Sequence, residues 1–141
     1  MRKYILAILS VFVILTLAAT VSAAELENTT IPGLNTTTDV YTAIDLAENQ
    51  NRTLAIIFDQ DSCMYCDMFK EDVLSNPEVQ NVLNEKFIVL ISDIHDNPDL
   101  AVEYGIYGTP SVQFVDSTGR EILKIEGYCD SEEFLQAIKE I

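Results

Sequence analysis

Two continuous apolar runs, residues 53–58 (TLAIIF) and 87–92 (FIVLIS), limit the possible folds of this 141-residue chain more than any other feature. Each run is rich in β-branched and aromatic residues and lacks polar alternation, which predicts a strand buried on both faces. Between the two runs, apolar residues recur at the spacing of one helix face. Two strands joined by a helix form a right-handed parallel crossover. The middle of the chain is therefore predicted to be a parallel β-α-β unit.

Helices are predicted on both sides of the first strand. One should begin with Thr38 as its N-cap. After the strand, Cys66, Phe69 and Val73 repeat at the spacing of one helix face. Asn76-Pro77 then has the composition of an N-cap and a first helical residue, so a helix should start or continue there.

The C-terminal third predicts a short helix, a hairpin and a last helix. Asn97-Pro98 marks the start of the short helix, and residues 111–115 and 121–126 alternate as two hairpin strands. Asp130 and Glu133 have the spacing of a capping box. The full order of elements is therefore α, β, α, β, α, β, β, α.

That order predicts one α/β domain over residues 38–141, with a central mixed sheet of about four strands between two layers of helices. Residues 24–37 are polar and Thr-rich, and are predicted to be a linker outside the core. Residues 1–23 have the layout of a secretory signal: basic residues, an apolar stretch over 4–21, and small residues that fit cleavage after Ala23. The alternative is an uncleaved membrane anchor. Either way we expect an extracytoplasmic domain, secreted or anchored to the outer face of the membrane.

The chain is acidic, with 8 Lys and Arg against 23 Asp and Glu and a formal net charge of −15. The negative electrostatic potential of such a chain favours solubility and repels nucleic acid, which excludes a nucleic-acid partner. It also disfavours docking on anionic lipid, so we expect membrane contact only through an uncleaved N-terminal segment. Three N-x-[ST] motifs are a weak signal for glycosylation: Asn28, Asn35 and Asn51.

Cys63 and Cys66 follow the first buried run, at the predicted start of a helix. The free N–H groups and partial positive charge of a helix N-terminus stabilise a thiolate, so the pKa of Cys63 should fall below its ordinary value of ~8.5. Cys66 lies one turn later on the apolar face, where it should be more sheltered and able to resolve a mixed disulfide. The pair is therefore predicted to be a redox device with Cys63 as the exposed thiol.

Two other roles for the pair are open. Zinc would need more ligands, and only Cys129 and the loop residue His95 are candidates, without the second closely spaced pair of a structural zinc site. A static disulfide suits an exported chain, although a four-residue loop constrains the unfolded chain very little. We expect no metal and no organic cofactor, and the alternative function is a non-catalytic binding module with a static Cys63–Cys66 disulfide.

The sequence resembles the thioredoxin superfamily over about residues 38–141. The resemblance rests on Cys63-Met64-Tyr65-Cys66 after the buried strand, and on YGIYGTPSVQFVD (104–116) before the hairpin and last helix. It implies a three-layer α/β/α fold with a cis Thr109–Pro110 bond beside the active-site disulfide. It also implies that Cys63 attacks, that Cys66 resolves, and that an extended substrate segment pairs with the backbone of Thr109. The substrate-binding residues expected on this basis are Met64, Tyr65, Gly108, Thr109 and Pro110.

The motif departs from typical thioredoxins. Ser62 replaces a Trp, Met64-Tyr65 replaces Gly-Pro, and Ile57 occupies the position of a buried Asp. Proton transfer at the second cysteine must then use water or another carboxylate, such as Asp59 or Asp61. The segment looks more like exported thioredoxin-related proteins, often paired with a membrane electron carrier of the CcdA/DsbD type. The expected partners are protein thiols and disulfides, and such a carrier.

Three acids crowd the pair: Asp59, Asp61 and Asp67. Negative charge raises the pKa of a thiol and opposes the stabilised reduced form of a strong oxidant. The sequence therefore predicts an enzyme, a protein thiol–disulfide oxidoreductase, with reductase or isomerase activity favoured.

Cys129, at the end of the hairpin, is read as a small apolar filler, with a third redox thiol as the alternative. Tyr65, Tyr107 and Tyr128 are read either as an aromatic rim around the pair or as ordinary surface tyrosines.

Overall fold

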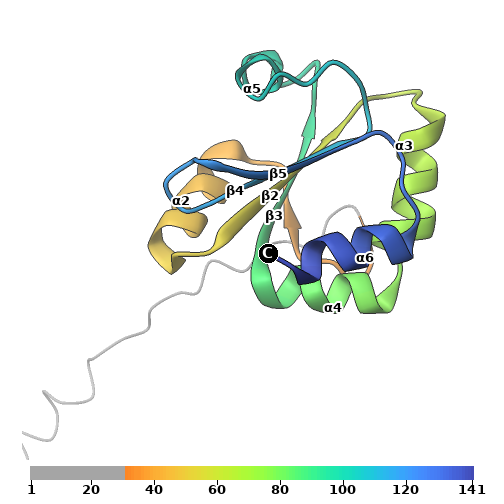
Figure 1. The fold of residues 1–141 in the computed structure, drawn as a ribbon. Coiled ribbons are helices and arrows are strands. Elements are labelled where there is room, and N and C mark those ends of the chain that lie inside the picture. Colours follow the sequence, from red (N-terminus) through yellow and green to blue (C-terminus); the bar gives the residue numbers. More distant parts are fainter. Residues whose placement is uncertain (1–30) are drawn as a thin grey trace, which may run out of the picture.

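The computed structural model describes residues 31–141; the predicted signal segment, Asn28 and the start of the predicted linker lie outside this range. Figure 1 shows a central sheet with helices on both sides. Its elements are β1 (Thr36–Thr37), α2 (Val40–Gln50), β2 (Thr53–Asp59), α3 (Met64–Met68), the π-helix η1 (Phe69–Leu74), α4 (Pro77–Lys86), β3 (Phe87–Asp93), α5 (Pro98–Glu103), β4 (Ser111–Val115), β5 (Glu121–Glu126) and α6 (Ser131–Lys139).

The sheet is mixed and has the strand order β1-β3-β2-β4-β5. β2 and β3 run parallel, with Thr53 opposite Phe87. β4 lies antiparallel to β2 and to β5. The predicted α/β sheet is confirmed, with one strand more than the four expected: β1, whose two threonines pair with Val89 and Leu90.

The segment before α2 contributes to the core, contrary to the linker predicted over residues 24–37. Ile31 and Leu34 are buried in the same cluster as the aromatic core. The side chain of Asn84 fixes the backbone of this segment, donating to the carbonyl of Gly33 and accepting the N–H of Asn35, both at 2.9 Å. Residues 31–37 therefore belong to the folded unit.

Helices cover both faces of the sheet. One face packs against η1, α4 and α6 around buried phenylalanines. Edge-to-face contacts join Phe69 to Phe134 and Phe87 to Phe114, each at a centroid distance of 5.3 Å. The other face packs against α2 and α5. The two central strands are buried on both faces, as their continuous apolar sequences predict.

The helix starts follow local capping chemistry, with one correction. Asp39, not Thr38, caps α2, because its carboxylate accepts the N–H of Thr42 at 2.6 Å. Asn76 caps α4, with Pro77 as the first helical residue. Asp130 caps α6. None of the helices within residues 31–141 is long and apolar enough to cross a membrane.

Candidate redox site

The cysteine pair lies where β2 ends and α3 begins. Ser62 takes a left-handed conformation, with φ of 61°, and turns the chain into the helix. Cys63 is itself the N-cap of α3, and its Sγ accepts the N–H of Cys66 at 3.2 Å. One helix N–H therefore points at the sulfur, an arrangement that stabilises negative charge there.

Cys63 and Cys66 form a disulfide, with their Cα atoms 5.2 Å apart. The exposed fraction is 9% for Cys63 and 2% for Cys66. Cys63 is the more accessible of the two, but it is more buried than the exposed nucleophilic thiol that the sequence predicts. The reason is that the loop carrying Thr109 lies against its sulfur.

That loop places two atoms of Thr109 beside Cys63, although the residues are 46 positions apart. The Thr109 hydroxyl lies 3.5 Å from Cys63 Sγ and can donate to it, and the Thr109 carbonyl lies 3.6 Å away. The Thr109–Pro110 peptide bond is cis. The carbonyl of Pro110 accepts the N–H of Gly127 at 2.8 Å, which ties the loop to the end of β5.

The predicted substrate-binding residues border the pair from two sides. Met64 and Tyr65 are 65% and 54% exposed on the first turn of α3. On the other side, Gly108 precedes Thr109, and its carbonyl accepts the hydroxyl of Ser111 at 2.7 Å. The structure thus brings the cysteine pair and the cis-proline loop into one surface region.

Only two of the three tyrosines considered for an aromatic rim meet. The rings of Tyr65 and Tyr128 are 6.4 Å apart, and the Tyr128 hydroxyl donates to Asp72 at 3.2 Å. Burial and the neighbouring Asp72 raise the pKa of Tyr128. Tyr107 stands apart from this pair and is almost fully exposed.

The acids near the pair differ in their surroundings. Asp59, at the end of β2, is largely buried and forms an ion pair with Lys70 of η1. Asp61 and Asp67 are exposed. Ile57 is buried in the core, so its position offers no proton acceptor. The sequence does not predict the Asp59–Lys70 pair, and its only signal for the pair is a lysine four residues after Cys66.

Cys129 is the free cysteine of the described residues and lies half-buried between β5 and α6. Burial, Glu133 and Asp130 together raise its pKa to about 11. Among residues 31–141, no group of three or more His, Cys, Asp or Glu side chains is placed to hold a metal ion.

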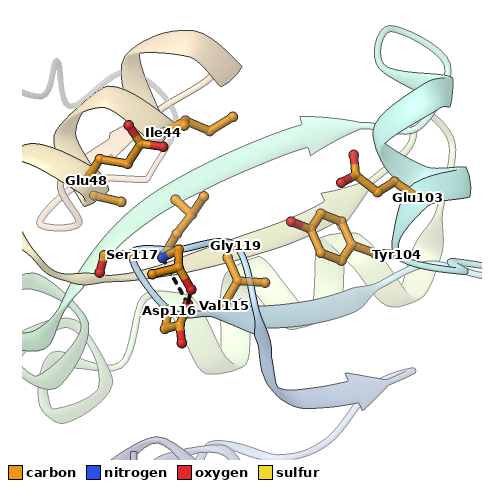
Figure 2. Close-up of a pocket in the computed structure, with 11 residues that line it drawn as sticks. Ile44, Glu48, Glu103, Tyr104, Val115, Asp116, Ser117 and Gly119 are labelled. Atoms are coloured by element: carbon orange, nitrogen blue, oxygen red, sulfur yellow. Dashed lines mark hydrogen bonds between the residues drawn. The ribbon is translucent and has the colours of Figure 1, made fainter.

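One hollow lies away from the cysteines, near the opposite end of β2. It is a cavity of about 170 Å³ between α2, the end of α5 and the β4–β5 turn, and Figure 2 shows the residues that line it. Glu103 and Glu48 point toward it, and burial raises the pKa of Tyr104. Asp116 in the turn accepts the hydroxyl of Thr118 at 2.6 Å, which lowers its pKa to about 2. This hollow contains no sulfur or nucleophilic pair.

Fold and site together define a thioredoxin-fold protein with a C-x-x-C disulfide at the start of a helix. Residues 40–141 match the family described as the thioredoxin-like domain, and the chain belongs to that family.

Relatives and solved structures agree with this assignment. The chain is 25% identical over 101 residues to thiol:disulfide interchange protein DsbD of Photorhabdus laumondii, and 30% identical over 101 residues to DsbD of Colwellia psychrerythraea. These matches cover 68% and 67% of this chain but only 18% and 17% of the relatives' lengths. The chain therefore corresponds to less than a fifth of each relative.

Two solved structures have the same fold, each with 26% sequence identity to this chain. A thioredoxin from Thermus thermophilus superimposes with a TM-score of 0.64 at 26% identity, covering 72% of this chain and 82% of the other. The oxidised C-terminal domain of DsbD from Neisseria meningitidis gives 0.60 at 26% identity, covering 72% and 91%. These similarities support thiol–disulfide redox activity in general.

Proposed function

We propose that the chain is an exported enzyme that exchanges disulfides with protein substrates through Cys63-Met64-Tyr65-Cys66. The observation that carries this proposal is the position of Cys63 Sγ. It caps a helix, accepts the N–H of Cys66 at 3.2 Å, and lies within 3.6 Å of the Thr109 loop. A nucleophilic sulfur and a docking segment are thus placed together.

The chemistry needs only the two cysteines and a proton source. The Cys63 thiolate attacks one sulfur of a substrate disulfide; the other sulfur leaves as a thiolate and takes a proton. The Cys66 thiolate then attacks Cys63 Sγ in the mixed disulfide. This step releases the second substrate thiol and leaves the Cys63–Cys66 disulfide, so two electrons have passed to the substrate.

The other predicted residues bind the substrate rather than react. Thr109 and Pro110 present an extended backbone beside the sulfur, which suits pairing with an extended substrate segment. Met64 and Tyr65 offer exposed apolar surface next to it. Gly108 leaves the approach open, because a Cβ placed there would meet no atom within 4 Å.

The charges favour a reductase or isomerase over an oxidase. Asp61 and Asp67 are exposed beside the pair, and negative charge works against the thiolate that a strong oxidant must stabilise. The pairing of Asp59 with Lys70 leaves these two acids as the main opposing charges. The relatives named DsbD support a membrane carrier of the CcdA/DsbD type as the electron donor. The signal-like sequence of residues 1–23 supports a location outside the cytoplasm.

A trapping experiment tests the function. Cys66→Ser should accumulate mixed disulfides with protein substrates, because the resolving thiol is missing, whereas Cys63→Ser should accumulate none. Equilibration with glutathione at set ratios should show one reversible two-electron couple. A pair that stays oxidised under strong reductant, with no trapped partner, would instead identify the static binding module.

A further inference from the structure

A hollow lies directly beside the loop that contacts Cys63. It is lined by the loop residues Tyr107, Gly108 and Thr109 and by Ser111, Glu126 and Gly127 at the paired ends of β4 and β5. Thr109 both lines the hollow and contacts the Cys63 sulfur, so a protein segment docked along residues 107–109 would lie beside the hollow.

Charge in the hollow has one sign. Glu126 is the charged residue among those that line it. Glu126 lies opposite Ser111 in the β4–β5 ladder, and Ser111 is two positions after Thr109 in the sequence. The nearby lysine of β5, Lys124, donates to the carbonyl of Tyr104 and does not line the hollow. Glu126 therefore lines this space, and no Lys or Arg of residues 31–141 lines it.

The remaining walls suit a long side chain. Tyr107 is 96% exposed, so its ring presents a free face at the edge of the hollow. A Cβ placed on Gly108 or Gly127 would meet no atom within 4 Å, so both glycine walls are open. Lys and Arg lay their aliphatic stems on apolar surface while the charged end stays near a carboxylate or over an aromatic ring.

We propose that this hollow is a specificity subsite, which binds a Lys or Arg side chain of the substrate protein close to its reacting cysteine. Glu126 supplies the opposite charge, and Tyr107 supplies the ring. This inference rests on the proposed function, since it concerns which protein thiols and disulfides the cysteine pair selects.

Short peptides joined through one cysteine to 5-thio-2-nitrobenzoate test the subsite. A matched set carries Lys, Gln or Glu within two residues of the cysteine, on either side. The reduced Cys63 thiolate attacks the peptide sulfur, and the coloured thionitrobenzoate leaves as the thiolate. Its rate of release, compared with that of Cys63→Ser, measures the reaction at the pair.

The reduced protein should favour the best-placed Lys peptide over its Gln counterpart by about three- to tenfold, with the Glu peptide slowest. Glu126→Gln should remove this preference, and Glu126→Lys should reverse it. Glu121→Gln is the matched control, because it makes the same charge change at the other end of β5 and should preserve the preference. Tyr107→Ala should weaken it, and Tyr107→Phe should retain it.

The outcomes separate the two proposals. Equal rates for the three peptides, or a preference that survives Glu126→Gln, would overturn the subsite while leaving the redox function standing. A loss of preference in Glu121→Gln as large as in Glu126→Gln would also overturn it, because the general acidity of the chain would then explain the effect. Release that does not depend on Cys63 would contradict the proposed function itself.

Discussion

Cys63 and Cys129 both lie at the entry to a helix, but only Cys63 occupies the capping position. Its sulfur accepts the N–H of Cys66 at the start of α3. At the start of α6 the cap is Asp130, whose carboxylate accepts the N–H groups of Glu132 and Glu133 at 3.0 and 2.9 Å. Cys129 is one residue too early, and Asp130 becomes a like charge against its thiolate.

The difference shows that the groups around each sulfur, and not its exposed fraction alone, govern the reactivity of these thiols. Cys129 is half-buried and more accessible than Cys63, yet its pKa is raised to about 11. Cys63 is nearly buried, but a helix N–H and the Thr109 hydroxyl point at its sulfur. Burial and two neighbouring carboxylates therefore favour the thiol at Cys129, whereas the helix N–H and the Thr109 hydroxyl favour the thiolate at Cys63.

The largest expected difference between the two cysteines is in activity. Cys63→Ser should lower the rate of disulfide reduction at least ~1,000-fold, because the nucleophile is removed. Cys129→Ser should leave the rate within about twofold, since a thiol with a pKa near 11 is almost fully protonated at neutral pH. Insulin reduction measures both variants. A large loss in Cys129→Ser would make Cys129 a third redox thiol.

A core substitution tests whether the buried cluster of Phe69 and Phe134 stabilises both α3 and α6. Phe134 of α6 is fully buried and packs edge-to-face on Phe69, which follows α3. Phe134→Ala should lower the free energy of unfolding by about 3–5 kcal/mol through lost burial and a cavity. Denaturant unfolding measures this change, and Phe134→Leu should cost clearly less. A small effect of Phe134→Ala would show that α3 and α6 are stabilised independently.

The pKa of Cys129 predicts slow alkylation with a characteristic pH profile. In a Cys63→Ser, Cys66→Ser variant, the iodoacetamide rate should rise about tenfold per pH unit up to about pH 10, because only the thiolate reacts. At pH ~8 the rate should be about two orders of magnitude below that of an unperturbed cysteine with a pKa of ~8.5. A rate that levels off above pH ~9 would place the thiol in an ordinary environment.

The smallest effect concerns one carboxylate beside Cys129. Glu133→Gln removes a negative charge that raises the pKa of the thiol, so the pKa should fall and alkylation at pH ~8 should become a few-fold faster. Glu132→Gln is the matched control and should change the rate less. Salt should reduce the Glu133 effect, because it screens exposed charges.

The sheet could be predicted to within a residue or two from sequence because its strands carry their own signals. The central strands are continuous apolar runs, and the hairpin strands alternate around a turn. β1 carries no such signal: it is two threonines long and held by backbone pairing with β3. Ile31 and Leu34 are isolated apolar residues, and only the folded chain shows what they pack against.

The site shows the same division between local and distant contacts. The helix start near Cys63 could be predicted from local sequence. The pair follows a buried strand, and Cys66 begins a series of apolar residues at helical spacing. The π-helical register of η1 could not be predicted, since Cys66, Phe69 and Val73 also fit ordinary α-helical spacing. The sequence also does not predict the ion pair between Asp59 and Lys70, or the contact of the Thr109 hydroxyl with Cys63 Sγ.

The strand order has a consequence for self-association. β5 and β1 are the two edges of the sheet, and β1 offers only two residues to a new partner. β5 is longer, but it begins with Glu121 and ends with Glu126. A second copy aligned antiparallel along this edge would bring acidic residues from two strongly negative molecules together. Charged or very short edge strands resist such intermolecular pairing, so the exposed hydrogen-bonding groups of this sheet are protected from aggregation.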